Sequence, residues 1–325
     1  MTAQHPQFIQ SFIIDKKGHG KKIDADEVQQ WSPDQGLLWV HLDVADPNAS
    51  RWLNKEARLT EIAVDTLLAG ETRPRSMVSE DGMLAVLRGV NSNPGADPED
   101  MVSVRIWIDE HRIISSRRRR LLSIEDISES LHAGKGPTTP GNFLVTLIER
   151  LADRIGNFVD SIEDRMDDAE DEISNDKAPG FRQRLSALRR QIAEVRRFLA
   201  PQRDALDRLN RQSSALLSDT EAHGLRQEAD RITRFLEDLD LARERAVVLQ
   251  EELLSLIAQE QNARMYVLSV VAAIFLPLTF ITGLLGMNVG GLPGLENSAG
   301  FAWSIVVMIA AGVFLFLFFR WKKWL

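Results

Sequence analysis

A row of small and polar side chains is the part of this sequence best suited to chemistry. At 3.6 residues per turn, spacings of three and four residues place its members on one face of a helix. The row consists of Asn262, Met265, Ser269, Ala272, Leu276, Thr279, Gly283 and Gly286. Amide and hydroxyl oxygens suit a path for hydrated cations. Close helix packing is the alternative, because small residues let helices approach one another.

Residues that could form an enzyme site are present but are not arranged as one. No two of the six histidines lie three or four residues apart, and no G-x-S-x-G or H-E-x-x-H motif occurs. The chain has no cysteine, which excludes disulfides and thiolate metal sites. We therefore predict that the protein is not an enzyme and has no permanently bound cofactor.

Two charged clusters each have a functional and a simpler interpretation. Acidic residues crowd the segment 160–172, where their oxygens could bind a divalent cation, and four arginines occupy 117–120. Charged helix and strand ends that only contact solvent are the simpler interpretation of both clusters. The net charge of −8 also argues against a broad basic surface, so we favour the solvated interpretation and expect no nucleic-acid partner.

Two long apolar runs predict membrane-spanning helices. The segment from Met265 to Met287 has 23 residues without a charge, enough for a helix to cross about 30 Å of hydrocarbon. A second run, 301–319, follows a short loop at 289–300. The first run carries the polar row, whereas the second has mostly bulky apolar side chains suited to lipid contact.

Basic residues near the ends of these runs predict their orientation. Arg264 precedes the first run, and Arg320, Lys322 and Lys323 follow the second. The loop between the runs has only one charge, Glu296. We therefore expect both termini in the cytoplasm and the loop outside. The N-terminal residues show no signal-peptide pattern, so the polar part of the chain is expected to stay inside. A hairpin that only tethers a soluble domain would show the same pattern.

The first 140 residues predict a mixed α/β domain. Short runs rich in β-branched and aromatic residues predict strands at 8–15, 37–44, 83–90, 102–108 and 112–116. An apolar stripe predicts a helix at 52–69, between the second and third of these strands.

Apolar residues at helical spacing predict three long helices in the rest of the chain. Segments 142–174 and 181–199 would form an antiparallel pair, and Pro201 would interrupt or kink the second helix. A third helix begins near Asp219 and continues into the first apolar run; at about 65 residues it would be about 100 Å long. Two spans cannot enclose an aqueous path, so conduction would require several copies around an axis.

Gly286, Met287 and Asn288 close this long helix, and a second span follows directly. In this position the triplet resembles the hallmark of the CorA superfamily of divalent-cation channels and transporters. Within the superfamily the chain looks most like the ZntB zinc-transporter branch. Four stretches carry that likeness: LAGETRPR at 68–75, APQRD at 200–204, VGGLPG at 289–294 and KWL at 323–325. The resemblance covers essentially the whole chain.

The resemblance implies an α+β cytoplasmic domain followed by long helices and two C-terminal transmembrane helices, assembled as a funnel-shaped homopentamer. The parts expected are a cytoplasmic α/β domain (1–140), antiparallel helices (141–218), a stalk helix that continues into the first transmembrane helix (219–288, with the span at about 265–287), an external loop (289–300), the second transmembrane helix (301–319) and a basic cytoplasmic tail (320–325).

The same resemblance implies that Gly286, Met287 and Asn288 form a selectivity filter, where five Asn288 amides would contact the water shell of a hydrated cation. Below it, the pore lining would comprise Asn262, Met265, Leu268, Ser269, Ala272, Leu276, Thr279 and Gly283. Thr279 and Asn262 match polar rings of the superfamily, and Met265, Leu268 and Leu276 would form apolar constrictions. Leu276 replaces the methionine often found there, and Glu296 is the one loop carboxylate able to attract cations.

The function implied is zinc transport across the bacterial inner membrane, by uptake coupled to protons. The oxygen and apolar lining suits an ion that passes hydrated, because zinc itself prefers nitrogen and sulfur ligands, so cadmium, nickel and cobalt are expected to pass too. Zinc efflux and a CorA-like magnesium/cobalt channel are the alternatives within transport. A membrane-tethered structural protein is the alternative outside it. The expected partners are these dications, protons, the lipid bilayer and further copies of the chain.

Overall fold

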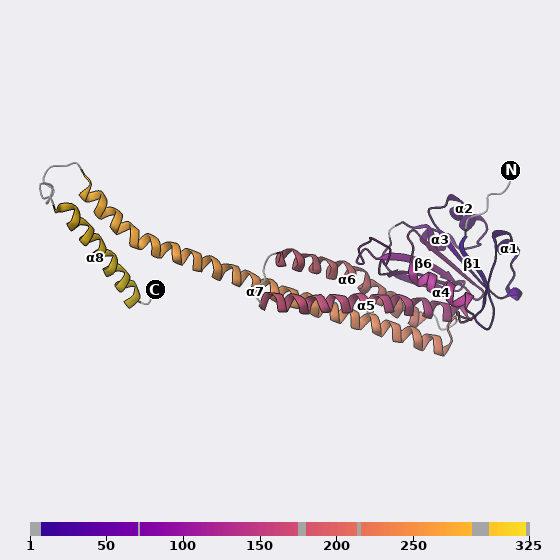
Figure 1. Cartoon of the computed structure of the whole chain (residues 1–325). Helices are drawn as coiled ribbons and strands as arrows, with labels where there is room; N and C mark the ends of the chain where they lie inside the picture. The colour runs from indigo at the N-terminus through magenta and orange to yellow at the C-terminus, as the bar shows by residue number, and fades with distance from the viewer. Residues whose placement is uncertain (1–7, 71, 175–179, 213–215, 288–298, 323–325) are drawn as a thin grey trace. The chain divides into compact units, whose positions relative to one another are not determined.

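The computed structural model describes residues 8–70, 72–174, 180–212, 216–287 and 299–322 (Figure 1). The chain forms two compact units, Met1–Gln250 and Glu251–Leu325. The first unit holds a β-sheet, its covering helices and most of the long helices, and the second holds the two long apolar segments. The predicted α+β region, long helices and C-terminal apolar helices are all confirmed, whereas the domain limits given above remain a prediction.

A seven-stranded mixed sheet forms the centre of the first unit, in the order β2-β1-β3-β7-β6-β5-β4. Its strands are β1 (Phe8–Ile14), β2 (Gly20–Lys22), β3 (Leu37–Asp43), β4 (Arg75–Ser79), β5 (Gly82–Gly89), β6 (Val102–Ile108) and β7 (Arg112–Arg117). All neighbours are antiparallel except β3 and β7, which run parallel with Leu38 opposite Arg112. The five predicted strands are confirmed, while β2 and β4 were not predicted.

Short helices cover one face of this sheet. Those before β4 are α1 (Ala25–Gln30), the 3-10 helix η1 (Pro33–Gln35), α2 (Pro47–Lys55) and α3 (Glu61–Leu68). Trp52, Leu53 and Leu67 of α2 and α3 bury their side chains against alternate residues of β3, including Val40 and Leu42. The sequence was wrong to predict one helix at 52–69, because two helices occupy this segment.

The break between α2 and α3 has a local cause. Arg58 adopts a left-handed backbone conformation with φ of 50°, which a continuous helix does not allow. The Thr60 side chain then accepts a hydrogen bond from the Ala63 amide and starts α3 as an N-cap. The chain therefore turns between the two helices, and the apolar side chains of both helices pack against the same face of the sheet.

The opposite face of the sheet carries a buried polar cluster. Trp39 Nε1 donates to Ser115 Oγ at 3.0 Å, and His41 Nδ1 lies 2.8 Å from the same oxygen. Phe143 of helix α5 (Pro140–Ser174) packs against Trp39, with ring centroids 5.0 Å apart. Burial lowers the pKa of His41 to about 3, and the nearby Arg117 charge acts in the same direction. His41 is therefore a neutral, packed residue, as its place in an apolar strand suggests.

We expect acidification to destabilise the fold in part through His41. In the unfolded chain this imidazole binds a proton below its ordinary pKa of 6.5, whereas in the folded chain it stays neutral down to about pH 3. Lowering the pH therefore favours the unfolded state, by about 2 kcal/mol at pH 5 from this residue alone. Thermal unfolding of the wild type and His41→Asn at pH 7 and pH 5 measures the effect. Equal losses on acidification in both proteins would contradict it.

Long helices follow the sheet and the short helix α4 (Leu122–His132): α5, α6 (Phe181–Gln212), α7 (Asp219–Leu285) and α8 (Gly300–Trp321). The predicted start of α7 near Asp219 and its run into the apolar segment are confirmed, since α7 is one helix of 67 residues. Of the two predicted effects of Pro201, an interruption of α6 is wrong, because the helix continues through it to Gln212, whereas a kink remains a prediction. Leu199, Gln202 and Ala205 are buried on either side of Pro201, so tertiary packing holds the helix there.

Gln202 joins α6 to the sheet. Its side-chain Oε1 accepts a hydrogen bond from the Arg88 amide at 2.6 Å, and its Nε2 donates to the Arg88 carbonyl at 3.1 Å. The amide group thereby pairs with β5 as a neighbouring strand residue would. Strand β4 cannot supply this pairing, because it begins at Arg75, opposite Val86, directly after Pro74.

Candidate pore-lining site

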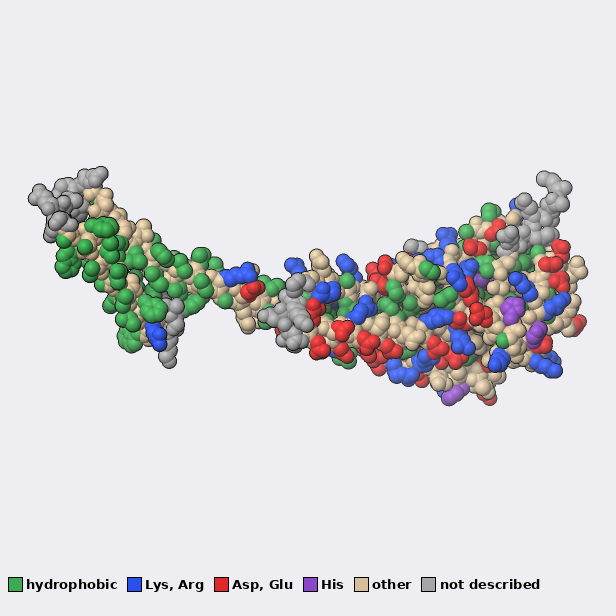
Figure 2. Space-filling view, in the orientation of Figure 1, with side chains coloured by type: hydrophobic (Ala, Val, Ile, Leu, Met, Phe, Trp, Pro, Cys, Tyr) green, Lys and Arg blue, Asp and Glu red, His purple; other side chains and the backbone are tan. Residues whose placement is uncertain are grey.

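The two helices of the second unit provide the candidate site. The C-terminal part of α7 and the whole of α8 are each long and apolar enough to cross a membrane, and these windows are not buried within the chain. On the face shown in Figure 2, hydrophobic side chains dominate both helices. The two apolar runs predicted as spans thus lie in helices as expected.

Residues of intermediate exposure lie on one side of each helix. In the apolar part of α7 they are Val270, Ala273, Ile274, Pro277, Leu278 and Ile281. In α8 the corresponding residues, with the buried Phe319, are Ser304, Ile305, Met308, Ala311, Gly312 and Leu315. Both sets recur at three or four residues, and both helices belong to one compact unit. We infer that these are the sides on which the two helices face each other.

The predicted pore-lining residues lie on the other side of α7. At about 100° per residue, the row is centred roughly opposite the partly covered side. Every residue predicted to line the pore is exposed in the single chain, and Leu268 and Leu276 are 64% and 75% exposed. The structure therefore brings the predicted row together on one open helix face, which no described residue of the same chain covers.

The hydroxyl groups on this face present oxygen rather than hydrogen. Ser269 Oγ donates to the Met265 carbonyl at 2.8 Å, and Thr279 Oγ1 donates to the Phe275 carbonyl at 2.8 Å. Each hydroxyl proton is thus used inside the helix, while the oxygen lone pairs remain available. Such oxygens can accept hydrogen bonds from the water shell of a cation.

Gly283 leaves a gap in the same face. A Cβ atom added to it would meet no atom of the described residues within 4 Å, outside the local helix backbone. Packing among the described residues of one chain therefore does not require glycine at this position. A close approach by another copy of the chain would require it.

The predicted filter lies at the end of α7. The Gly286 amide donates to the Thr282 carbonyl at 2.9 Å just after the helix ends, and Met287 is 44% exposed. Asn288 and Glu296 lie outside the residues that the structure describes. The roles of the filter triplet and of Glu296 therefore remain predictions.

The two charged clusters lie elsewhere, in the first unit. Arg245 pairs with Asp167 at 2.5 Å and Glu170 at 2.7 Å, and these acids raise its pKa. Among the described residues, no group of three or more His, Asp or Glu side chains could hold a metal ion. In the arginine run, Arg120 forms two hydrogen bonds with Glu125, at 2.6 and 2.5 Å.

Arg88 and Arg105 were not singled out from the sequence. Both are buried, although they lie in strands β5 and β6 among apolar residues. Each is the only charged residue of its strand, and this was the available signal. A lone arginine in a buried strand needs partners, because an isolated buried charge is costly.

Comparisons with known proteins identify the relatives of this chain. The family model described as CorA-like Mg2+ transporter protein matches residues 34–323. The "Divalent cation transporter CmaX" of Pseudomonas aeruginosa is 38% identical, over 98% of this chain and 96% of that protein. The "Zinc transport protein ZntB" of Pectobacterium atrosepticum is 37% identical, over 99% of this chain and 97% of that protein. The solved structure of full-length CmaX has a TM-score of 0.85 at 37% identity, over the whole of both chains.

Proposed function

We propose that this chain, which belongs to the CorA-like Mg2+ transporter family, carries divalent cations through a pore and that zinc is its main ion. The observation that carries the proposal is the open face of α7, where polar and small residues recur over the length of a membrane span. A face exposed to lipid would gain nothing from an amide, hydroxyls and glycines. A face turned to an aqueous path would use all of them.

The pore would be formed by five copies of the chain, each contributing one α7 face. One α7 and one α8 cannot enclose water, so further copies are needed, and the empty space beside Gly283 would admit them. The number five and the funnel shape follow from the family resemblance. In this arrangement α8 would lie outside α7 and contact lipid, in the bacterial inner membrane, with both termini in the cytoplasm.

Zinc would pass largely hydrated. The row offers amide, hydroxyl and carbonyl oxygens but no nitrogen or sulfur donor except Met265, so it would not bind bare zinc tightly. Weak contact with the water shell permits both entry and release. Cadmium, nickel and cobalt would pass by the same route, through the filter at Gly286, Met287 and Asn288.

Uptake coupled to protons is the direction that we propose. Neither 265–287 nor 301–319 contains a carboxylate, histidine or lysine, so the proton-binding group would lie outside the membrane core. Glu296 is the candidate in the loop. Zinc efflux is the alternative direction. The name of the CmaX relative, which specifies only a divalent cation, keeps a magnesium/cobalt channel as the second candidate.

Flux measurements in liposomes test the proposal. Purified full-length protein is reconstituted, and zinc entry is measured with and without an inward proton gradient and with magnesium as competitor. Zinc entry that rises with the gradient and is unaffected by magnesium supports the proposal. Magnesium flux that is independent of the gradient would support the second candidate, and absence of flux for both ions would leave a membrane-tethered structural role.

Removing one hydroxyl from the row is expected to slow zinc entry. Ser269→Ala deletes an oxygen acceptor in every copy, worth about 1 kcal/mol and so about a fivefold loss of flux. Ser304→Ala in α8 is a matched control, because its hydroxyl also donates to a carbonyl of its own helix at 2.8 Å but lies outside the row. Equal flux in the two variants would argue that the row does not line the path.

A further inference from the structure

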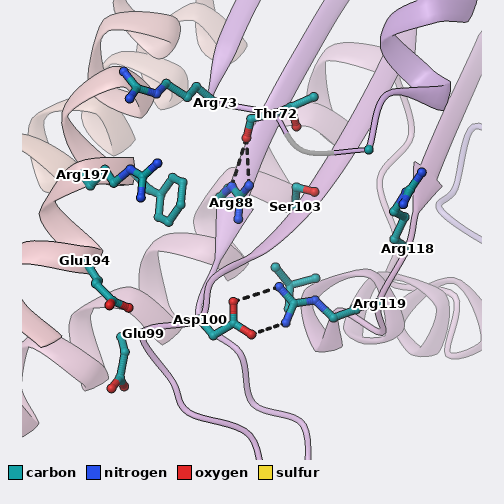
Figure 3. A pocket seen from close by; sticks show the side chains of 13 residues that line it. Thr72, Arg73, Arg88, Glu99, Asp100, Ser103, Arg118, Arg119, Glu194 and Arg197 are labelled. Atoms are coloured by element: carbon teal, nitrogen blue, oxygen red, sulfur yellow. Dashed lines mark hydrogen bonds and ion pairs between the residues drawn. The ribbon is translucent and has the colours of Figure 1, made fainter.

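A separate cavity lies in the first unit, between strands β5 and β6 and helix α6. It has a volume of about 680 Å³, and arginines from four segments of the chain line it (Figure 3). They are Arg73 before β4, Arg88 in β5, Arg118 and Arg119 directly after β7, and Arg197 in α6. Three acidic residues also line it: Glu99, Asp100 and Glu194.

The positive charges of this cavity exceed the negative ones. Asp100 is already paired with Arg119, through two hydrogen bonds that lower the pKa of Asp100. The guanidinium groups of Arg73, Arg118 and Arg197 form no ion pair or hydrogen bond with any described residue. Within the described part of the chain, three arginines are therefore available to a bound molecule.

A buried arginine adds to the positive potential from behind the cavity wall. Arg105 is fully buried, and its Nη2 donates to the Gly70 carbonyl at 2.5 Å. Its Nε and Nη1 have no hydrogen-bond partner in the described part of the chain. Burial, together with the charges of Arg118 and Arg88, lowers the pKa of Arg105 to about 10. An anion at this end of the cavity would relieve the repulsion among these three groups.

Gly70 lets Arg118 approach the same point from the cavity side. A Cβ atom at Gly70 would lie 3.3 Å from Arg118 Nη2, so the glycine leaves just enough room for this guanidinium. The neighbouring Thr72 has a buried hydroxyl without a partner among the described residues, and Ser103 offers a second hydroxyl nearby. The arginine end of the cavity thus combines guanidinium and hydroxyl donors.

We propose that this cavity binds a small soluble anion that carries phosphate groups. Guanidinium groups match phosphate oxygens in geometry and form two parallel hydrogen bonds with them. The volume exceeds the needs of a single phosphate and is in the range of sites for small organic ligands, so a diphosphate or nucleotide is favoured. Glu99 and Glu194 lie on one side of the cavity in Figure 3 and would repel phosphate groups, which would direct them to the opposite side, near Arg118.

Two of the stretches that carry the family resemblance meet beside this cavity. In the first, 68–75, the Thr72 carbonyl accepts hydrogen bonds from Arg88 Nε at 3.2 Å and Nη2 at 2.9 Å. In the second, 200–204, Gln202 pairs with the Arg88 backbone. Neither stretch lies in the apolar spans, so a pore does not account for them. A ligand site in the first unit would account for them, in addition to the pairing of Gln202 with the Arg88 backbone.

Calorimetric titration of the full-length protein in detergent tests the proposal, with inorganic phosphate, pyrophosphate and ATP as probes. Wild-type protein should bind pyrophosphate or ATP more tightly than phosphate. Arg118→Ala and Arg73→Ala should each weaken that binding by about tenfold to a hundredfold, because each removes charge-assisted hydrogen bonds. Arg208→Ala is the matched control, an exposed arginine of α6 outside the cavity, and should bind as the wild type does. Equal melting temperatures will show that the variants are folded.

Three outcomes would overturn this proposal. Wild-type protein that binds none of the probes lacks the site, and equal affinity in Arg118→Ala and Arg208→Ala would mean non-specific attraction. Glu71 lies between Gly70 and Thr72, outside the described residues, and Glu71→Gln is therefore titrated too. Binding that appears only in Glu71→Gln would assign the arginines to an internal ion pair. The titrations need no zinc, so their failure is distinguishable from failure of transport.

Discussion

Replacing Ala272 by phenylalanine is expected to reduce zinc flux by about tenfold or more, because a ring of bulky apolar side chains at a narrow point excludes water and hydrated ions. Ala272 is exposed on the polar row of α7, so there is room for a larger side chain beside the described residues of its own chain. The effect would arise only where several copies bring their rows together. Flux into liposomes measures it, after size-exclusion chromatography has shown that the oligomer is intact.

Ala310→Phe is the control for this experiment. Ala310 is also exposed, but it lies in α8, on the side away from its partly covered residues. The same substitution there is expected to leave flux within about twofold of the wild type, since lipid accommodates another apolar side chain. A strong loss in Ala310→Phe with normal flux in Ala272→Phe would assign the pore to α8 and refute the proposed lining.

Gln202→Leu is expected to lower the free energy of unfolding by about 2–5 kcal/mol. Gln202 is 1% exposed, and its amide satisfies both the N–H and the carbonyl of Arg88. Leucine fills a similar volume but leaves these two backbone groups buried without partners. Removing hydrogen-bond partners from buried groups costs more than the bonds contribute when formed.

Thermal unfolding followed by circular dichroism measures this loss. Gln183→Leu makes the same change at an exposed position of the same helix, and it should alter stability by no more than about 0.5 kcal/mol. A melting temperature in Gln202→Leu that equals the value for Gln183→Leu would show that the pairing with Arg88 is replaceable, for example by water.

The sequence predicted elements well where a single periodic signal dominated. The strand at 102–108 is reproduced residue for residue as β6, because Val or Ile occupies every second position of a seven-residue run, which is the period of a strand. β4 was missed, since its sequence, RSMVS, has no such run. It becomes a strand by pairing with β5 across a tight turn. α4 was also missed, although Ile124, Ile127 and Leu131 have helical spacing.

Local rules gave the wrong result where tertiary packing decided the structure. The apolar stripe at 52–69 is present, but the sheet is covered better by two short helices with a turn at Arg58. Pro201 is a helix breaker in isolation, yet contacts on both sides of it keep α6 intact. Neither result follows from a window of sequence, because the deciding contacts come from distant residues.

The two candidate sites, the row on α7 and the arginine cavity, also differ in whether the sequence could predict them. The row on α7 could be predicted, because helical periodicity alone places Ser269, Ala272 and Thr279 on one face. The arginine cavity could not be, because Arg73, Arg88 and Arg118 come from separate segments that meet only when the sheet has formed. Sequence spacing carries no information about such a meeting.

The parallel pairing of β3 with β7 has a consequence for how the chain is made. Leu38 of β3 pairs with Arg112 of β7, which is synthesised much later. The two halves of the sheet can therefore join only after β4, β5 and β6 have been made. Contacts between such distant residues form slowly, because a long loop must close first. Until then β3 exposes one unpaired edge, which is a template for pairing with another chain. A nascent chain that stalls before residue 112 is therefore at greatest risk of aggregation, well before either apolar helix exists to reach a membrane.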